Sequence, residues 1–207
     1  MIYTKPFRLT RNFPGSKAIN TSKNPVKKFI PHFLALLINT GCVPSPVTLA
    51  KNDPATLIAN ADSLLATKPD DLGLRSAIIT AHLNLAKTNN SMDNYKAVLK
   101  LDPKNAAANY HIHMTEGKSH HKKGYKNGQW NAIQSFSKAA TAIDTLGEPY
   151  YWLGRAYEKK DEMDFELPLE SYDKALTLYL SDDMRTKIIS ARAALLKRKK
   201  TYEDFWK

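Results

Sequence analysis

Residues 146–180 read LGEPYYWLGRAYEKKDEMDFELPLESYDKALTLYL, and this stretch predicts two α-helices packed against each other. Its second half is amphipathic around Tyr172 and Ala175. Its first half places large side chains around a glycine at helical spacing, namely Tyr150, Leu153, Gly154 and Tyr157. A glycine lets two helices approach closely, and its large neighbours fill the groove between them. Since one such pair cannot bury its own apolar face, we expect further pairs stacked beside it.

Two sets of markers repeat this pattern upstream. Pro69 and Pro103, each expected to end a helix, are 34 residues apart. The aromatic position of the second helix falls on Tyr95, Phe136 and Tyr172, at spacings of 41 and 36 residues. A period of 34 residues with these markers resembles the tetratricopeptide repeat. The resemblance implies an all-α fold, an α-α superhelix of about eight helices in a right-handed stack.

This register assigns residues 53–207 to a helical repeat domain. It places repeats near 70–103, 104–144 and 145–180, followed by a capping helix over 181–200. The glycine position of the second repeat falls on His113 in this register. The second repeat also contains seven extra residues, which we expect in a basic loop or frayed helix end with the sequence GKSHHKKGYKNGQ. At the carboxyl end, Phe205 and Trp206 are expected to fold back onto the stack.

The amino terminus has a different composition. Residues 1–41 contain no acidic residue and carry a charge of +7, so we expect a disordered extension followed by a signal sequence. Lys27 and Lys28 precede the apolar run Phe29–Ile38, which is too short to span a bilayer. Residues 42–52 begin CVPSPV and are expected to form an extended linker.

The only cysteine of the chain, Cys42, directly follows Asn39-Thr40-Gly41. This arrangement resembles a bacterial lipoprotein signal, which implies that Cys42 receives lipid and becomes the first residue of the mature protein. The implied location is the cell envelope, anchored by lipid and facing the periplasm, and Val43 is compatible with the outer rather than the inner membrane. The alternative is a cytoplasmic scaffold in which Phe29–Ile38 is a buried helix and Cys42 is an ordinary small residue.

The charge of the chain does not indicate a nucleic-acid partner. The net charge is +11, but the residues after position 41 contribute only +4 of it. No aromatic motif typical of DNA or RNA binding accompanies the basic residues. The chain also lacks the G-x-S-x-G, phosphate-binding glycine-rich and H-E-x-x-H motifs. We therefore expect a protein that is not an enzyme and has no cofactor.

A metal site is the competing interpretation. His113, Glu116 and His120 share one face of a helix, and imidazoles with a carboxylate can bind zinc. Four lysines lie nearby, at positions 118, 122, 123 and 126, and the spacing matches no known zinc signature. A buried, hydrogen-bonded histidine is the simpler interpretation of His113. A metal-binding protein or metal-dependent enzyme is therefore kept only as the alternative.

The resemblance also implies a binding surface, because the first helices of tetratricopeptide repeats line a concave groove that receives peptides or partner helices. The groove positions carried over by register are Tyr110, Met114, Glu148, Tyr151, Arg155 and Glu158. Tyr and Arg are the residue types that dominate binding hot spots. Tyr110 has a second interpretation, in which it only seals one repeat against the next. We expect a protein or peptide partner.

Overall fold

The computed structural model describes residues 44–124 and 126–207, and the described residues form ten α-helices and no strand. The predicted all-α fold class, with helices packed in consecutive pairs, is confirmed for the described residues. The number of helices is ten rather than about eight, because the amino-terminal part contains three short helices. Cys42, the apolar run Phe29–Ile38 and the rest of the expected signal sequence lie outside the described residues.

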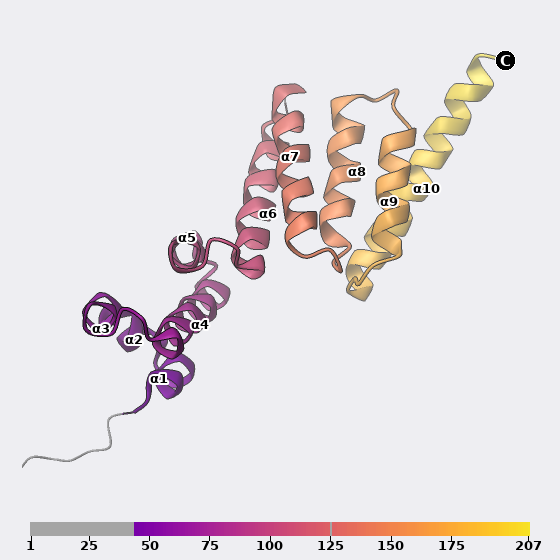
Figure 1. The fold of residues 1–207 in the computed structure, drawn as a ribbon. Coiled ribbons are helices and arrows are strands. Elements are labelled where there is room, and N and C mark those ends of the chain that lie inside the picture. The colour runs from indigo at the N-terminus through magenta and orange to yellow at the C-terminus, as the bar shows by residue number, and fades with distance from the viewer. Residues whose placement is uncertain (1–43, 125) are drawn as a thin grey trace, which may run out of the picture. The chain divides into compact units, whose positions relative to one another are not determined.

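Three helical pairs and a long final helix make up the larger part of the structure. Each helix from α4 to α10 contacts the next one along the chain (Figure 1). The three pairs lie within the ranges expected for the three repeats. Their bounds are Leu72–Asn89 (α4) and Met92–Leu101 (α5), Ala106–Lys123 (α6) and Lys126–Ala142 (α7), and Glu148–Lys160 (α8) and Glu166–Leu176 (α9), followed by Asp182–Phe205 (α10).

The expected linker over residues 42–52 is wrong where the structure describes it. Pro46–Asn52 form helix α1, which is followed by Pro54–Ala59 (α2) and Ala61–Thr67 (α3). The hydroxyl of Ser45 accepts a hydrogen bond from the Thr48 amide at 3.2 Å, and Pro46 occupies the first turn. Proline at that position starts a helix, because the missing N–H has no intrahelical partner to lose. Both α1 and α2 then pack on α4.

Two glycines set the distance between paired helices. A Cβ atom on Gly154 would lie 2.5 Å from a ring carbon of Tyr172, and one on Gly117 would lie 2.4 Å from a ring carbon of Phe136. The glycine position of the second repeat is therefore Gly117, not His113. The register was displaced because α6 contains 11 residues before its glycine whereas α8 contains six. The aromatic partners Tyr172 and Phe136 are completely buried.

The extra residues of the second repeat lengthen its helices instead of forming a loop. Helices α6 and α7 contain 18 and 17 residues, against 13 and 11 in α8 and α9. Gly124 ends α6 in the left-handed conformation with φ of 82°. Close to this turn, His121 Nδ1 lies 2.7 Å from Oε1 of Gln129, and Nε2 of Gln129 donates to the His121 carbonyl at 3.1 Å. These hydrogen bonds satisfy a buried amide and join the ends of the two helices.

Helix α10 covers the third pair only in part. Ile188 and Leu195 are buried in a cluster with Tyr151, Phe165 and Tyr172. The carboxyl end does not fold back as expected, since Phe205 and Trp206 are 79% and 70% exposed. Lys199 of α10 contacts Glu166, the first residue of α9, and α10 continues beyond that point to Phe205. Among the described residues, no helix combines the length and the apolar character needed to cross a membrane.

Candidate partner-binding surface

The six residues expected to line a groove divide into two groups. Tyr110, Met114 and Tyr151 are 7%, 4% and 8% exposed, so they belong to the core and do not present their side chains to a partner. For these three residues the burial contradicts the expected groove role, and Tyr110 lies in a core cluster with Leu153 and Ala156 of α8. The reason is that side chains of α7 and α8 enclose Tyr110 and Met114, whereas side chains of α9 and α10 enclose Tyr151. Glu148, Arg155 and Glu158 keep part of their side chains accessible.

Glu148 joins α6 to α8 at the amino end of α8. Its carboxylate accepts hydrogen bonds from Lys118 Nζ at 2.9 Å, Tyr110 Oη at 3.1 Å and Trp152 Nε1 at 3.3 Å. The ammonium group of Lys118 also lies 5.4 Å from the centre of the Trp152 ring. One carboxylate therefore fixes three side chains from two helices.

The ionisation of this cluster follows from these contacts. Burial opposes the charge on Glu148 and would raise its pKa. The hydrogen bond and positive charge of Lys118, and the hydrogen bonds from Tyr110 and Trp152, have a larger effect and hold the pKa of Glu148 below its usual value. Burial, together with the neighbouring Glu148 charge, raises the pKa of Tyr110 well above its usual value. The pair therefore consists of an ionised acceptor and a neutral phenol donor at neutral pH.

Glu158 forms a second junction, one that joins α8, α9 and α10. It accepts a hydrogen bond from the Tyr172 hydroxyl and a charged contact from Arg198 Nη1 at 3.3 Å. Only 18% of the Glu158 side chain is exposed. Burial and this carboxylate raise the pKa of Tyr172 well above its usual value, so Tyr172 stays a neutral donor.

Arg155 lies next to this junction and is the one cation among the six expected groove residues. Its guanidinium donates to the Tyr151 hydroxyl at 3.3 Å, and its Nε is 4.0 Å from Glu158 Oε1. Its side chain is nevertheless 46% exposed. The Glu158 carboxylate already accepts hydrogen bonds from Tyr172 and Arg198, and it lies at 4.0 Å from Arg155. Most N–H donors of the Arg155 guanidinium therefore remain available for a ligand.

A hollow of about 250 Å³ surrounds Arg155 and is bounded by α6, α8 and α10. Besides Arg155, its lining residues are His121, Glu158, Lys159, Glu162 and Arg198. Lys159 Nζ donates to the His121 carbonyl at 3.2 Å, which ties α8 to the end of α6. Burial, and the nearby charges of Lys159 and Arg155, lower the pKa of His121 despite its bond to Gln129.

Sequence reasoning missed Lys118, His121, Trp152 and Arg198 as parts of this surface. Gly124 and Gly128 led us to expect Lys118 and His121 in a loop or frayed helix end, although α6 extends through both of them. Arg198 meets Glu158 across 40 residues of sequence. The one sequence signal for Trp152 was its position four residues after Glu148, which puts both on one face of α8.

The expected metal ligands do not come together. His113 Nδ1 lies 3.1 Å from Glu116 Oε2, in one exposed pair on α6. The Nδ1 atom of His120 is buried and has no hydrogen-bond partner. Within residues 44–124 and 126–207, no group of three or more His, Cys, Asp or Glu side chains is placed to hold a metal ion. The metal interpretation therefore lacks its ligand set.

Comparison with known proteins identifies no family. No family model matches the chain, and no curated protein matches it. Among solved structures, the chain is similar to the crystal structure of MamA, with 15% sequence identity and a TM-score of 0.34. That similarity covers 71% of this chain and 89% of MamA. A superposition this loose assigns no function to the chain.

Proposed function

We propose that this protein is a non-enzymatic interaction module that binds an acidic segment of a partner protein at the hollow around Arg155. The observation that carries the proposal is the half-exposed guanidinium of Arg155. Its hydrogen bond to the Tyr151 hydroxyl positions it, and its nearest carboxylate, that of Glu158, is 4.0 Å away. A planar guanidinium held by its neighbours loses little conformational freedom when it binds a carboxylate in bidentate fashion.

The charge of the surrounding surface supports an acidic partner. Lys118, Arg155, Lys159 and Arg198 contribute four positive charges from α6, α8 and α10. The carboxylates of Glu148 and Glu158 both accept hydrogen bonds from several donors of this surface. Two positive charges therefore remain in excess, and Glu162 at the edge of the hollow offsets one of them. Complementary charge of this kind increases the rate of association and fixes the register of a partner.

The contacts of Glu148 and Glu158 are also the reason that we propose a protein without enzymatic activity. A general acid or base needs a titratable group that can exchange its proton with a substrate. Glu148 and Glu158 instead hold helices together through bonds to tyrosine, tryptophan, lysine and arginine side chains. Their role in this arrangement is structural.

The binding test compares the native protein with Arg155→Glu in chemical cross-linking and affinity capture from the native host. Reversing the charge places a carboxylate beside Glu158, so recovery of a partner should fall at least about tenfold, as expected when a hot-spot contact of 1.4 kcal/mol or more is lost. Lys96→Glu, at an exposed position on α5, is the matched control and should recover the partner normally. Recovery of the same partners by Arg155→Glu at the native level would refute the assignment.

We also propose that the module is attached to a bacterial envelope through lipid on Cys42 and faces the periplasm, at the outer rather than the inner membrane. The support is the signal-like sequence that precedes Cys42. Metabolic labelling with a fatty acid should mark the native chain and leave Cys42→Ala unlabelled. Equal labelling of the two chains would refute the attachment of lipid to Cys42. An unlabelled native protein in the soluble fraction would favour the cytoplasmic alternative.

A further inference from the structure

The apolar stripe of α10 extends beyond the helix that covers it. Ile188, Leu195 and Tyr202 follow each other at intervals of seven residues, which places them on one side of α10. The first two are buried against the third helical pair. Helix α9 has 11 residues and α10 has 24, or lengths of about 16 and 36 Å at 1.5 Å per residue. The apolar stripe therefore continues along the last turns of α10, where α9 no longer covers it.

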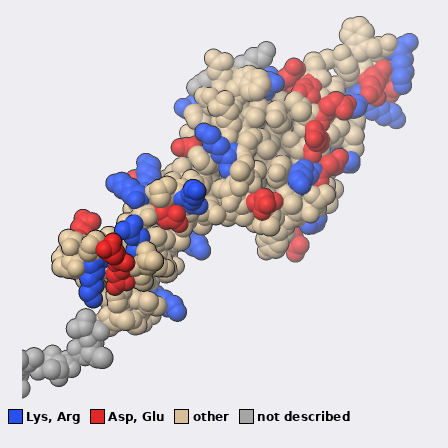
Figure 2. Space-filling model, in the orientation of Figure 1, with Lys and Arg blue, Asp and Glu red and all other residues tan. Residues whose placement is uncertain are grey.

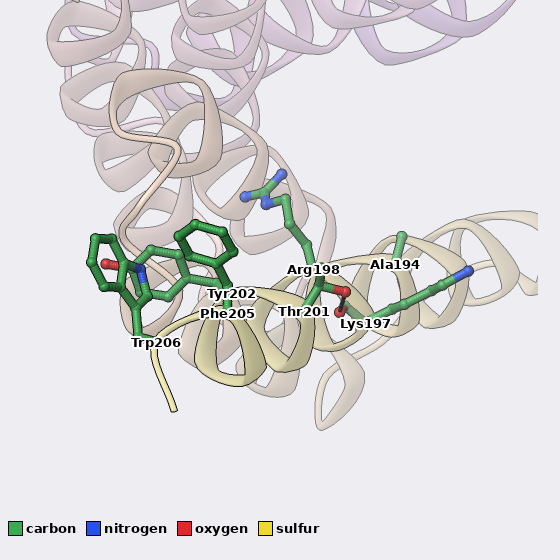
Figure 3. Close-up of a pocket in the computed structure, with 7 residues that line it drawn as sticks. All are labelled: Ala194, Lys197, Arg198, Thr201, Tyr202, Phe205 and Trp206. Carbon is green, nitrogen blue, oxygen red and sulfur yellow. Dashed lines mark hydrogen bonds between the residues drawn. The ribbon is translucent and has the colours of Figure 1, made fainter.

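Three aromatic side chains occupy this uncovered end. The Tyr202 ring lies 5.7 Å from that of Phe165, which is its contact with the body of the domain. The Trp206 ring lies 6.1 Å from Tyr202 and 5.3 Å from Phe205. These rings, with Lys197 and Arg198, border a shallow, open hollow of about 590 Å³ along α10 (Figure 3). The rings thus support one another and remain accessible.

Cations surround the aromatic end. Residues 192–207 contain six lysines and arginines and two acidic residues. Arg198 contacts Glu158 at 3.3 Å and Lys199 contacts Glu166 at 2.7 Å, while Lys197 and Lys200 form no ion pair with any described residue. Figure 2 shows blue side chains beside an uncharged surface where α10 ends, with a group of red side chains adjoining them. The end of α10 is therefore aromatic at its tip, and around it the lysines and arginines outnumber Glu203 and Asp204.

We propose that this end of α10, comprising Tyr202, Phe205 and Trp206 with Lys197 and Lys200, is a contact surface for anionic membranes. Tyr and Trp favour the level of lipid headgroups, because the ring is apolar and its hydroxyl or N–H remains hydrated. Lysines next to an apolar insertion gain further binding energy from anionic headgroups. A protruding helix end with exposed rings fits a deformable lipid surface better than a rigid protein pocket. The contact does not depend on the hollow around Arg155.

The test uses the full chain with phosphatidylcholine vesicles that contain phosphatidylglycerol and a brominated lipid. Bromine quenches tryptophan fluorescence only at short range, so the measurement reports on Trp206 rather than on binding through the basic amino terminus. Native protein should be quenched, and Trp206→Phe should lose most of this quenching. Trp130→Phe, which alters another exposed tryptophan, should retain it. Equal quenching of native protein and Trp206→Phe would overturn the proposal.

The cationic part is tested by Lys197→Gln with Lys200→Gln. A lysine near an anionic surface contributes about 1 kcal/mol, so the loss of two should weaken vesicle affinity roughly tenfold or more. Lys122→Gln with Lys123→Gln is the matched control at the end of α6. Vesicles without phosphatidylglycerol should give little quenching. Unchanged vesicle affinity of the Lys197 and Lys200 variant would overturn the proposal. The proposal would also fail if the native protein sedimented as a dimer and the double variant Phe205→Ser with Trp206→Ser sedimented as a monomer.

Discussion

At the scale of single residues, this fold depends on two points where a helix backbone meets an aromatic ring. Gly154 faces Tyr172 and Gly117 faces Phe136, and at either glycine a Cβ would overlap the ring. Both aromatic side chains are completely buried, so neither ring can move away without opening the core. The sequence revealed the first contact because Gly154 sits in a strong motif. It hid the second, because the extra turn of α6 moves Gly117 away from the expected position.

Gly154→Ala should destabilise the protein by about 1–3 kcal/mol, the usual cost of placing additional atoms in a packed core. The added methyl group would approach the Tyr172 ring to 2.5 Å. Gly73→Ala is the control, because its Cβ would meet only an Asp71 side-chain oxygen at 3.3 Å. Urea unfolding followed by circular dichroism measures both variants. Equal stability of Gly154→Ala and the native protein would contradict the close approach of α8 and α9.

His121 gives the fold a pH dependence with a definite sign. Burial lowers its pKa in the folded state below the ordinary value of 6.5, so the unfolded chain binds more protons just below that pH. The stability from neutral His121 is complete above pH 6.5 and is lost as the pH falls toward the folded-state pKa. His111, whose pKa burial also lowers, contributes with the same sign.

The free energy of unfolding should therefore decrease between pH 7.5 and pH 5.5. His121→Asn keeps a donor that can bond to Gln129 and should make this decrease smaller, as measured by urea unfolding at the two pH values. His113→Asn, at the exposed pair with Glu116, is the matched control. An unchanged pH dependence in His121→Asn would show that His121 is not held in its neutral form.

At the scale of helices, capping residues mark several helix starts, whereas the sequence did not predict the helix lengths. Asp53 caps α2 and Ser181 caps α10, as their sequences indicate. Helix α1 was missed because prolines near Ser45 suggested an extended chain, although Pro46 sits in a first turn. The turn between α6 and α7 was misread because two glycines suggested a loop. One of them ends α6, whereas Gly128 lies buried within α7.

Helix α10 offers a matched pair of neighbouring leucines, one buried and one exposed. Leu195 is 1% exposed in the core, and Leu196 is 39% exposed. Leu195→Ala should cost about 2–5 kcal/mol, from lost burial and the cavity left behind. Leu196→Ala should change stability by about 0.5 kcal/mol or less, as surface substitutions do. Thermal unfolding of both variants tests the orientation of α10, and equal losses would contradict it.

At the scale of the whole chain, the arrangement of paired helices was predictable and the binding surface was not. The pairing follows from local periodicity and the 34-residue spacing of Pro69 and Pro103, which the sequence shows directly. The surface depends on contacts between distant residues, such as Lys118 with Glu148 and Arg198 with Glu158. These contacts require the actual rotation of each helix, which a register taken from a repeat family does not provide.

The hollow bounded by α6, α8 and α10 is proposed to receive an acidic segment of a protein partner. The most direct measurement places a photo-crosslinking amino acid at position 155 of the full chain in the native host and identifies the linked peptides by mass spectrometry. The same amino acid at position 96, on α5, is the control. We predict that position 155 links to an Asp- and Glu-rich peptide and that position 96 does not. Links from both positions to the same peptide, or none from position 155, would contradict the claim.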